Sequence, residues 1–230
     1  MKYTELEVAQ MTLEKCLGSG EQSSVWTVKD NNEICIKLFE KPDEYNLERS
    51  ALEKVINKRH CISILGIWEN ATKSQYKICM ERGKPNPFTS TDSELSLDHL
   101  KNLFQDSEDL IKELNESEIT HGDIHLGNIV LGADKCFKLI DFGKSSEPQN
   151  NNLNGIQIYY AFFQAVILYL AKKNSINLDG VKLVNRWDYV KHLVKSFDNE
   201  LFARLRAAND IIGIKNLMEN LLKTIENSSK

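Results

Sequence analysis

Hydrophobic and polar residues follow two different periods along the chain. In its first third, short apolar runs alternate with polar turns, a pattern typical of strands. These runs cover residues 13–17, 25–28, 34–39, 62–68 and 76–80. Residues 44–58 differ, because Ala51, Leu52 and Val55 fall on one helical face with charges opposite. We therefore expect a small sheet accompanied by one helix.

The pattern changes again after a loop at 83–96, which contains two of the four prolines. Beyond the loop, the spacing of apolar residues is mostly helical, with short strands and loops between. The expected helices cover residues 97–119, 154–173, 186–207 and 210–228, and the strands and loops cover 121–150. We predict an α+β fold in one domain, with a β-rich N-terminal lobe (about 1–82) and a mainly helical C-terminal lobe (about 83–230).

Composition narrows the possible partners. The 230 residues are 41% hydrophobic and 27% charged, which is typical of a globular protein. The formal net charge is −4, so the chain lacks the excess of basic residues typical of nucleic-acid-binding proteins. We therefore expect no nucleic-acid partner. The five cysteines are scattered and form no C-x-x-C pair, which favours reduced thiols and a cytoplasmic location.

The longest apolar stretch, residues 156–171, is interrupted by Gln157 and Gln164. It is shorter than the ~20 residues that cross a bilayer, so we expect a buried helix and no membrane span. The N-terminus shows no apolar core of a secretory signal.

Two segments carry the candidate chemistry, HGDIHLGNIVL at 121–131 and KLIDFG at 138–143. Asp123 and Asn128 are five residues apart, and Asp141 follows thirteen residues after Asn128. Two carboxylates and an amide oxygen suit Mg²⁺ or Mn²⁺ together with phosphate oxygens. A carboxylate that does not bind the metal can orient or deprotonate a hydroxyl group.

These two segments resemble the catalytic loop and the metal-binding Asp-Phe-Gly of the protein-kinase-like superfamily. The resemblance implies a bilobal kinase-like fold and in-line transfer of the γ-phosphoryl group of ATP. It implies that Asp123 accepts the hydroxyl proton, and that Asn128 and Asp141 hold the metal.

The N-terminal third agrees with this resemblance. Gly18, Gly20 and Ser23 resemble the glycine-rich phosphate loop, with Ser23 in place of the third glycine. Ile34-Cys35-Ile36-Lys37 resembles the V-A-I-K strand, so Lys37 would pair with the α- and β-phosphates. The lysine needs a carboxylate partner on the next helix, for which Glu44, Glu48 and Glu53 are candidates. We expect Glu48, since Leu52 and Val55 follow it at the family's spacing.

Residues 76–83 resemble the last strand of the small lobe and the adenine hinge. By order along the chain, Met80 would be the gatekeeper. The backbone from Glu81 to Gly83 would bind the adenine edge, and Val25 and Cys35 would cover the ring.

Three departures qualify the resemblance. Gly122 replaces the arginine that holds a phosphorylated activation loop in regulated kinases. Only about eleven residues (144–154) separate Asp-Phe-Gly from the apolar helix, and no Ala-Pro-Glu follows. His125 stands where protein kinases carry a lysine that steadies the γ-phosphate, and a histidine is only partly charged near neutral pH.

The trimmed design and the Gly127-Asn128 pair resemble the compact protein kinases that bacteria deliver into host cells by type III secretion. The H-G-D-x-H pattern instead resembles aminoglycoside and choline phosphotransferases. Three functions stay open: a constitutive Ser/Thr kinase acting on a host protein in the host cytosol, a small-molecule kinase, and a nucleotide-binding pseudokinase scaffold. The presence of Lys37, Asp123, Asn128 and Asp141 argues against the scaffold.

Overall fold

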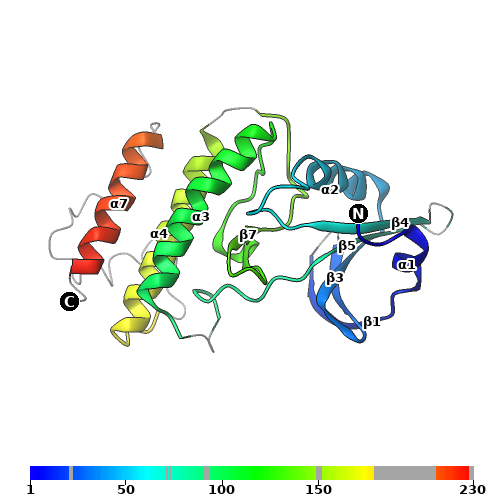
Figure 1. Ribbon diagram of the computed structural model, residues 1–230, viewed down its shortest axis with the longest axis horizontal. Helices are drawn as coiled ribbons and strands as arrows, with labels where there is room; N and C mark the ends of the chain where they lie inside the picture. The colour runs from blue at the N-terminus through cyan, green and yellow to red at the C-terminus, as the bar shows by residue number, and fades with distance from the viewer. Residues whose placement is uncertain are drawn as a thin grey trace.

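The structure is a computed structural model that describes residues 1–20, 23–70, 72, 74–90, 94–148, 152–178 and 211–227. Within these ranges it has an N-terminal sheet and a C-terminal group of helices, which Figure 1 shows side by side. The expected α+β fold class is confirmed. The helix expected at 186–207 lies outside the described residues.

The N-terminal sheet has five antiparallel strands in the order β1-β2-β3-β5-β4. The strands are β1 (Leu13–Ser19), β2 (Ser23–Val28), β3 (Asn31–Phe39), β4 (Ile64–Asn70) and β5 (Gln75–Glu81). All five correspond to the apolar runs in the sequence. Helix α2 (Pro42–Lys54) begins with a proline, which suits a first helical turn, and packs against β3 and β5.

The expectation of a single helix in this part was wrong. A short helix, α1 (Glu5–Gln10), precedes β1 and packs against β4. Thr4 and Glu7 form a reciprocal capping box at its start, a signal that is visible in the sequence. The helix has six residues, and only Val8 is buried. One buried apolar residue does not form the repeated spacing by which a helix is recognised in a sequence.

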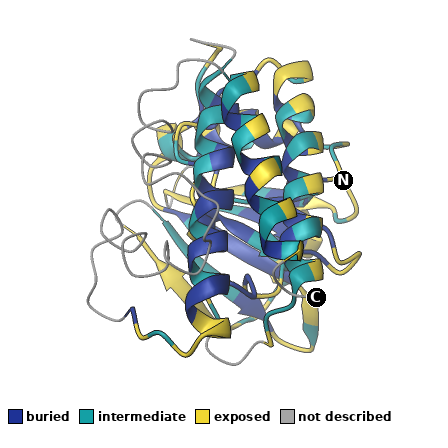
Figure 2. Ribbon diagram, turned by 90° about the vertical axis from the view of Figure 1, so that its left-hand side faces the viewer, coloured by how far each residue is buried: buried dark blue, intermediate teal, exposed yellow. Residues whose placement is uncertain are grey.

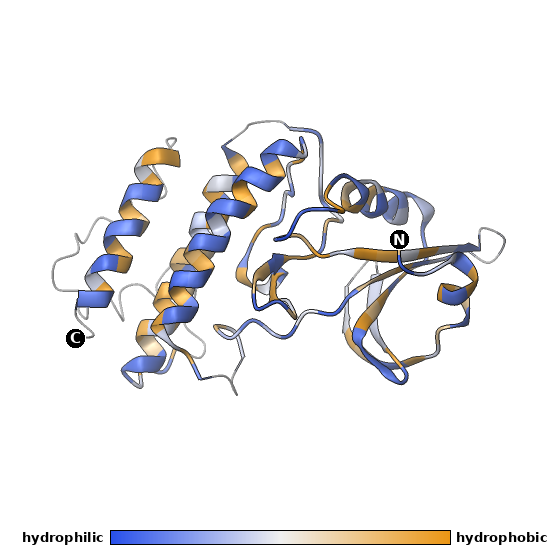
Figure 3. Cartoon of the chain, viewed as in Figure 1, coloured by the Kyte–Doolittle hydropathy of each residue, from blue (hydrophilic) through white to orange (hydrophobic). Residues whose placement is uncertain are grey.

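Three long helices form most of the C-terminal part: α3 (Leu97–Glu116), α4 (Leu153–Lys173) and α7 (Ile211–Asn227). Helix α4 packs against both α3 and α7. Hydrophilic and hydrophobic residues alternate turn by turn along α3 and α7 in Figure 3. Burial follows the same division, since the outer helix faces are exposed and the faces between helices are buried (Figure 2).

Helix α4 is long and apolar enough to cross a membrane by length and composition. However, 67% of its most apolar 18-residue window is buried inside the protein, and its buried side chains include Tyr159, Phe162 and Phe163. A core helix accounts for this pattern without a bilayer.

A small hairpin connects the two parts. It consists of the 3₁₀ turn η2 (Leu126–Asn128), β6 (Ile129–Leu131) and β7 (Phe137–Leu139). The Lys84 and Leu131 backbones exchange hydrogen bonds of 2.7 and 3.0 Å. The Leu139 N–H donates to His60 O at 2.8 Å, and its carbonyl accepts from Ile62 at 3.0 Å. These bonds attach the sheet to the hairpin from both sides.

Candidate active site

Lys37 lies at the centre of the junction. It is on β3 between Val25 of β2 and Ile78 of β5, and its side chain is only 7% exposed. Its Nζ lies 2.8 and 2.6 Å from the two carboxylate oxygens of Glu48, and 2.8 Å from Oδ1 of Asp141. The expected pairing of Lys37 with Glu48 is confirmed, and the same ammonium also contacts Asp141.

This triad places two carboxylates around one ammonium. Burial opposes the charge of Lys37, but Glu48 and Asp141 outweigh burial and raise its pKa. Burial likewise opposes ionisation of Asp141, but the charge of Lys37 and its hydrogen bond hold the pKa of Asp141 below its usual range. The triad therefore carries net negative charge when both carboxylates are ionised, which favours binding of a further cation.

Asp141 follows β7 in a strained backbone conformation, with φ of 65°. Neighbouring contacts hold this turn in place: the Ile140 N–H donates to Asn128 O at 2.9 Å, and buried Phe142 packs edge-on against His121. The Asp141 side chain remains 49% exposed toward the junction. The turn thus presents a carboxylate to solvent from a fixed backbone.

His121 organises the loop that carries Asp123. Its Nδ1 accepts from the Asp123 N–H at 3.3 Å, so in the neutral ring Nε2–H donates to Ile140 O at 3.0 Å. Burial lowers the pKa of His121 to about 4, so the ring is neutral at physiological pH. The neutral ring therefore connects the Asp123 loop to the segment before Asp141 through one hydrogen bond to each.

Asn128 fixes the other end of this loop. Its Nδ2 donates to Asp123 O at 2.9 Å, which leaves Oδ1 as the acceptor of the amide. With the half-exposed carboxylate of Asp141, this oxygen supplies the kind of ligands that a hard divalent cation prefers. The side chains fit the metal expected from the sequence, and their role as ligands stays a proposal.

Two nitrogen-bearing side chains, Lys144 and His125, lie near the carboxylate of Asp123. Lys144 Nζ donates to Asp123 Oδ2 at 2.9 Å, and His125 Nε2 lies 4.0 Å from the same oxygen. The other ring nitrogen of His125 accepts from the Gly127 N–H at 3.0 Å and caps η2. His125 thus stabilises the turn and contacts Asp123 less closely than Lys144 does.

A cavity of about 290 Å³ collects the polar groups of the site. Its lining comes from the β1–β2 turn, β3, α2 and both catalytic segments, and consists of Gly20, Ser23, Lys37, Phe39, Glu44, Glu48, Asp123, Asp141, Gly143 and Lys144. Six of the residues predicted from the sequence are thereby brought together: Gly20, Ser23, Lys37, Glu48, Asp123 and Asp141.

The glycine-rich turn faces open space. The Gly20 N–H donates to Ser23 O at 2.9 Å and closes the turn. A Cβ atom built on Gly18 would meet nothing within 4 Å, and one on Gly20 would meet only Ser23 O at 4.0 Å. Packing within the described residues therefore does not require glycine here, and room for a phosphate stays the proposed reason.

The expected adenine hinge lies apart from the cavity lining. Met80 is buried in the sheet opposite Cys35 and Ile64. The Glu81 N–H donates to Ser63 O at 3.0 Å, and its side chain accepts from Lys138 at 2.7 Å.

Two further observations reduce the number of backbone groups that could bind adenine at the expected hinge. The Arg82 N–H donates to Glu33 O at 2.8 Å, so this donor and that of Glu81 are already used inside the protein. Gly83 has a packing reason, since a Cβ there would lie 2.2 Å from Val130. Any adenine contact at the expected hinge therefore falls to the carbonyls of Glu81 and Arg82 and to the Gly83 backbone. Val25 is partly buried against the core and stays a prediction as the ring cover.

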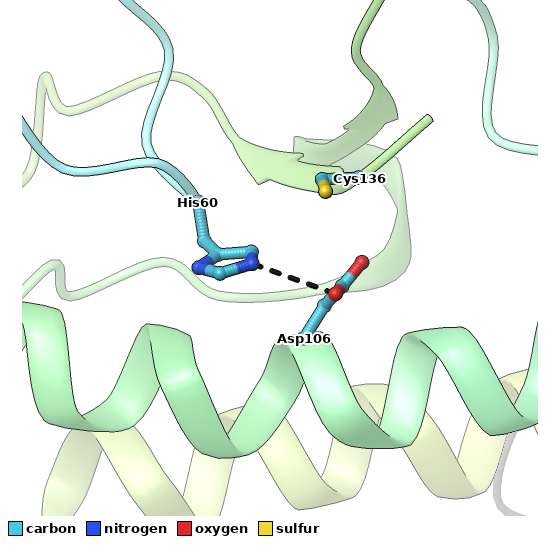
Figure 4. A group of neighbouring side chains, drawn as sticks. All are labelled: His60, Asp106 and Cys136. Atoms are coloured by element: carbon cyan, nitrogen blue, oxygen red, sulfur yellow. Dashed lines mark ion pairs between the residues drawn. The ribbon is translucent and has the colours of Figure 1, made fainter. Parts of the chain in front are cut away.

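A second polar cluster lies behind the junction, where His60, Asp106 and Cys136 come together (Figure 4). Their donor atoms lie within 4.8 Å of one another, and these residue types can hold a metal. However, Nε2 of His60 lies 3.4 Å from Asp106 and Nδ1 lies 3.1 Å from Glu113. A protonated imidazole between two carboxylates explains the arrangement without a metal.

The sequence did not single out Lys144 or Asn154. Lys144 had one detectable signal, a lysine directly after Asp-Phe-Gly in a chain that lacks the usual lysine near Asp123. Asn154 had none, because its importance comes from a contact: it accepts from the His121 N–H at 3.1 Å and donates to Ile119 O at 2.7 Å.

Comparison with known proteins agrees with this geometry. The profile of the family described as "Protein kinase domain" matches residues 11–171, which include the sheet, the triad and most of α4. The chain therefore belongs to the protein kinase domain family.

One curated relative is the "Probable serine/threonine-protein kinase glkA" of Dictyostelium discoideum. The two sequences are 25% identical over 168 residues, which cover 70% of this chain and 35% of the relative. The chain thus spans about a third of that relative's length.

Proposed function

We propose that the protein is an ATP- and Mg²⁺-dependent Ser/Thr protein kinase that is active without phosphorylation of an activation loop. The observation that carries the proposal is the triad of Lys37 with Glu48 and Asp141, next to Asp123 in one cavity. A positioned ammonium and clustered carboxylates are what in-line phosphoryl transfer requires, because its catalysis is mainly positioning and electrostatic stabilisation.

Each group has a separate part in the proposed reaction. Asn128 and Asp141 would hold the metal ion, which supplies positive charge at the phosphates when bound. Lys37 positions the α- and β-phosphates, and the turn containing Gly18, Gly20 and Ser23 covers them. Asp123 orients the acceptor hydroxyl and receives its proton.

Gly122 and the short sequence between Asp-Phe-Gly and the apolar helix support the proposed absence of loop regulation. Gly122 has φ of 83°, and a Cβ there would lie 2.5 Å from Lys144 O. An arginine at this position does not fit this backbone. This supports a compact, unregulated kinase of the bacterial effector type, with a host protein as substrate in the host cytosol.

The proposed kinase is tested with labelled ATP on cell lysate, using Asp123→Ala as the matched variant. We expect transfer to protein by the wild type, and nucleotide binding without transfer by Asp123→Ala. An Asp123→Ala protein with a near wild-type rate would contradict the assignment. Label found on small metabolites and absent from protein would favour the phosphotransferase that the H-G-D-x-H pattern resembles.

A further inference from the structure

Lys144 lies closer to the carboxylate of Asp123 than His125 does. Its Nζ is 2.9 Å from Asp123 Oδ2, whereas Nε2 of His125 is 4.0 Å from that oxygen. Lys37 is engaged with Glu48 and Asp141 instead. The position two residues after Asp123 holds a histidine, and an ammonium from a different segment reaches the same carboxylate.

The backbone around Lys144 is fixed, although its side chain is 66% exposed. Ser146 and Thr120 exchange backbone hydrogen bonds of 2.8 and 2.9 Å, and the Ser145 N–H donates to Phe142 O at 3.0 Å. Gly122 allows the Lys144 carbonyl to approach the loop closely. The lysine therefore begins from a constrained position and can still adjust its tip.

The ion pair between Lys144 and Asp123 is too weak to hold the ammonium at Asp123 permanently. Ion pairs near the surface contribute little to stability because water screens them, so an incoming hydroxyl can displace the ammonium from Asp123. Lys144 lines the same cavity as Lys37 and Asp141. On leaving Asp123, the ammonium remains beside the place where a transferring phosphoryl group must lie.

We propose that Lys144 is a catalytic residue that neutralises the transferring γ-phosphoryl group, in place of a lysine at position 125. This inference rests on the proposed phosphotransferase function. The acceptor oxygen forms a bond to the γ-phosphorus while the bond to the β–γ bridging oxygen breaks. ADP leaves with that electron pair, and the hydroxyl proton passes to Asp123. Lys144 keeps its proton throughout and stabilises charge on the equatorial oxygens.

Two measurements on Lys144→Ala test this role, with Lys112→Ala as a matched surface control. We expect kcat to fall about 100-fold. We also expect weaker binding of the non-hydrolysable analogue AMP-PNP, with binding of ADP unchanged, because ADP has no γ-phosphate. Lys112 lies on the exposed side of α3, so its variant should match the wild type in both assays.

A second experiment moves the ammonium from position 144 to position 125 and tests whether activity returns. The double variant Lys144→Ala/His125→Lys restores an ammonium two residues after Asp123, and we expect at least about tenfold recovery of kcat over Lys144→Ala. Wild-type or increased kcat in Lys144→Ala overturns the proposal, and so does the absence of recovery in the double variant.

The experiments distinguish failure of the proposed kinase function from failure of the proposed role of Lys144. A wild-type protein that binds AMP-PNP but phosphorylates no protein or metabolite contradicts the proposed function. In that case the ratio of AMP-PNP to ADP affinity in Lys144→Ala still decides whether Lys144 contacts the γ-phosphate, and an unchanged ratio rejects the contact.

Discussion

The side chain of Asn154 accepts a hydrogen bond from the backbone N–H of His121 at 3.1 Å. Its amide also donates to Ile119 O at 2.7 Å, and the residue is 3% exposed. Asn154 belongs to the first turn of α4, so these two bonds tie the loop bearing Asp123 to the central helix.

Asn154→Ala removes both bonds and leaves a buried N–H and a buried carbonyl without this partner. We expect the free energy of unfolding to fall by about 1–3 kcal/mol, as measured in urea. We also expect kcat to fall, since the Asp123 loop loses its anchor. Asn174→Ala is the matched control, because the Asn174 side chain donates to Leu170 O at the far end of α4. Equal losses of kcat in both variants would contradict a specific anchoring role.

Glu48→Gln removes a carboxylate from the buried triad. Lys37 then pairs with Asp141 alone, so the ammonium shifts and competes with the metal for that carboxylate. We expect kcat/KM for ATP to fall on the order of 10–100-fold, because small misplacements of charged groups are costly in catalysis. Glu53→Gln is the control, since Glu53 pairs with partly buried Arg49 on the same helix, away from Lys37. Equal kinetics for the two variants would remove Glu48 from the site.

Gly122→Ala tests the close approach of the catalytic loop to Lys144. The φ of 83° and a Cβ contact of 2.5 Å with Lys144 O both penalise a side chain there. We expect a loss of about 1–3 kcal/mol in unfolding free energy. Gly18→Ala is the comparison, because a Cβ there meets open space, and its stability should change by less than about 0.5 kcal/mol. A fully stable Gly122→Ala protein would contradict the observed backbone.

His60 makes stability depend on pH. Burial opposes its charge, but the hydrogen bond that the ring donates to Asp106 and the charge of Glu113 outweigh burial and raise the pKa of the ring. The third neighbour, Cys136, has a raised thiol pKa and stays neutral. A raised folded-state pKa means that His60 stabilises the protein fully below about pH 6.5, the usual histidine value, and less as pH rises through the folded-state pKa.

Urea unfolding of the wild type and His60→Gln at several pH values isolates this contribution. We expect the difference in unfolding free energy between the two proteins to be largest near pH 6 and to shrink toward pH 9. A difference that is constant with pH would show that His60 does not change its charge in this range.

Much of this architecture was predictable because it rests on local patterns. The five strands followed from short apolar runs between turn residues, and α2, α3, α4 and α7 from helical spacing. Lys37, Asp123, Asn128 and Asp141 stood out because each lies in a short motif whose residue types suit phosphate and metal chemistry. Glu48 was preferred over Glu44 and Glu53 by spacing alone, and its ion pair with Lys37 confirmed the choice.

By itself, the sequence determined the elements and the reactive groups, since periodicity and motif spacing act within a few residues along the chain. Only the tertiary structure decided which groups meet. Lys144 is 21 residues from Asp123 and Asn154 is 33 from His121, and such contacts depend on how the hairpin and α4 pack. Packing therefore decides that Lys144 is the cation beside Asp123 in a chain without a lysine at position 125. An ammonium can act on the reaction only where the fold places it.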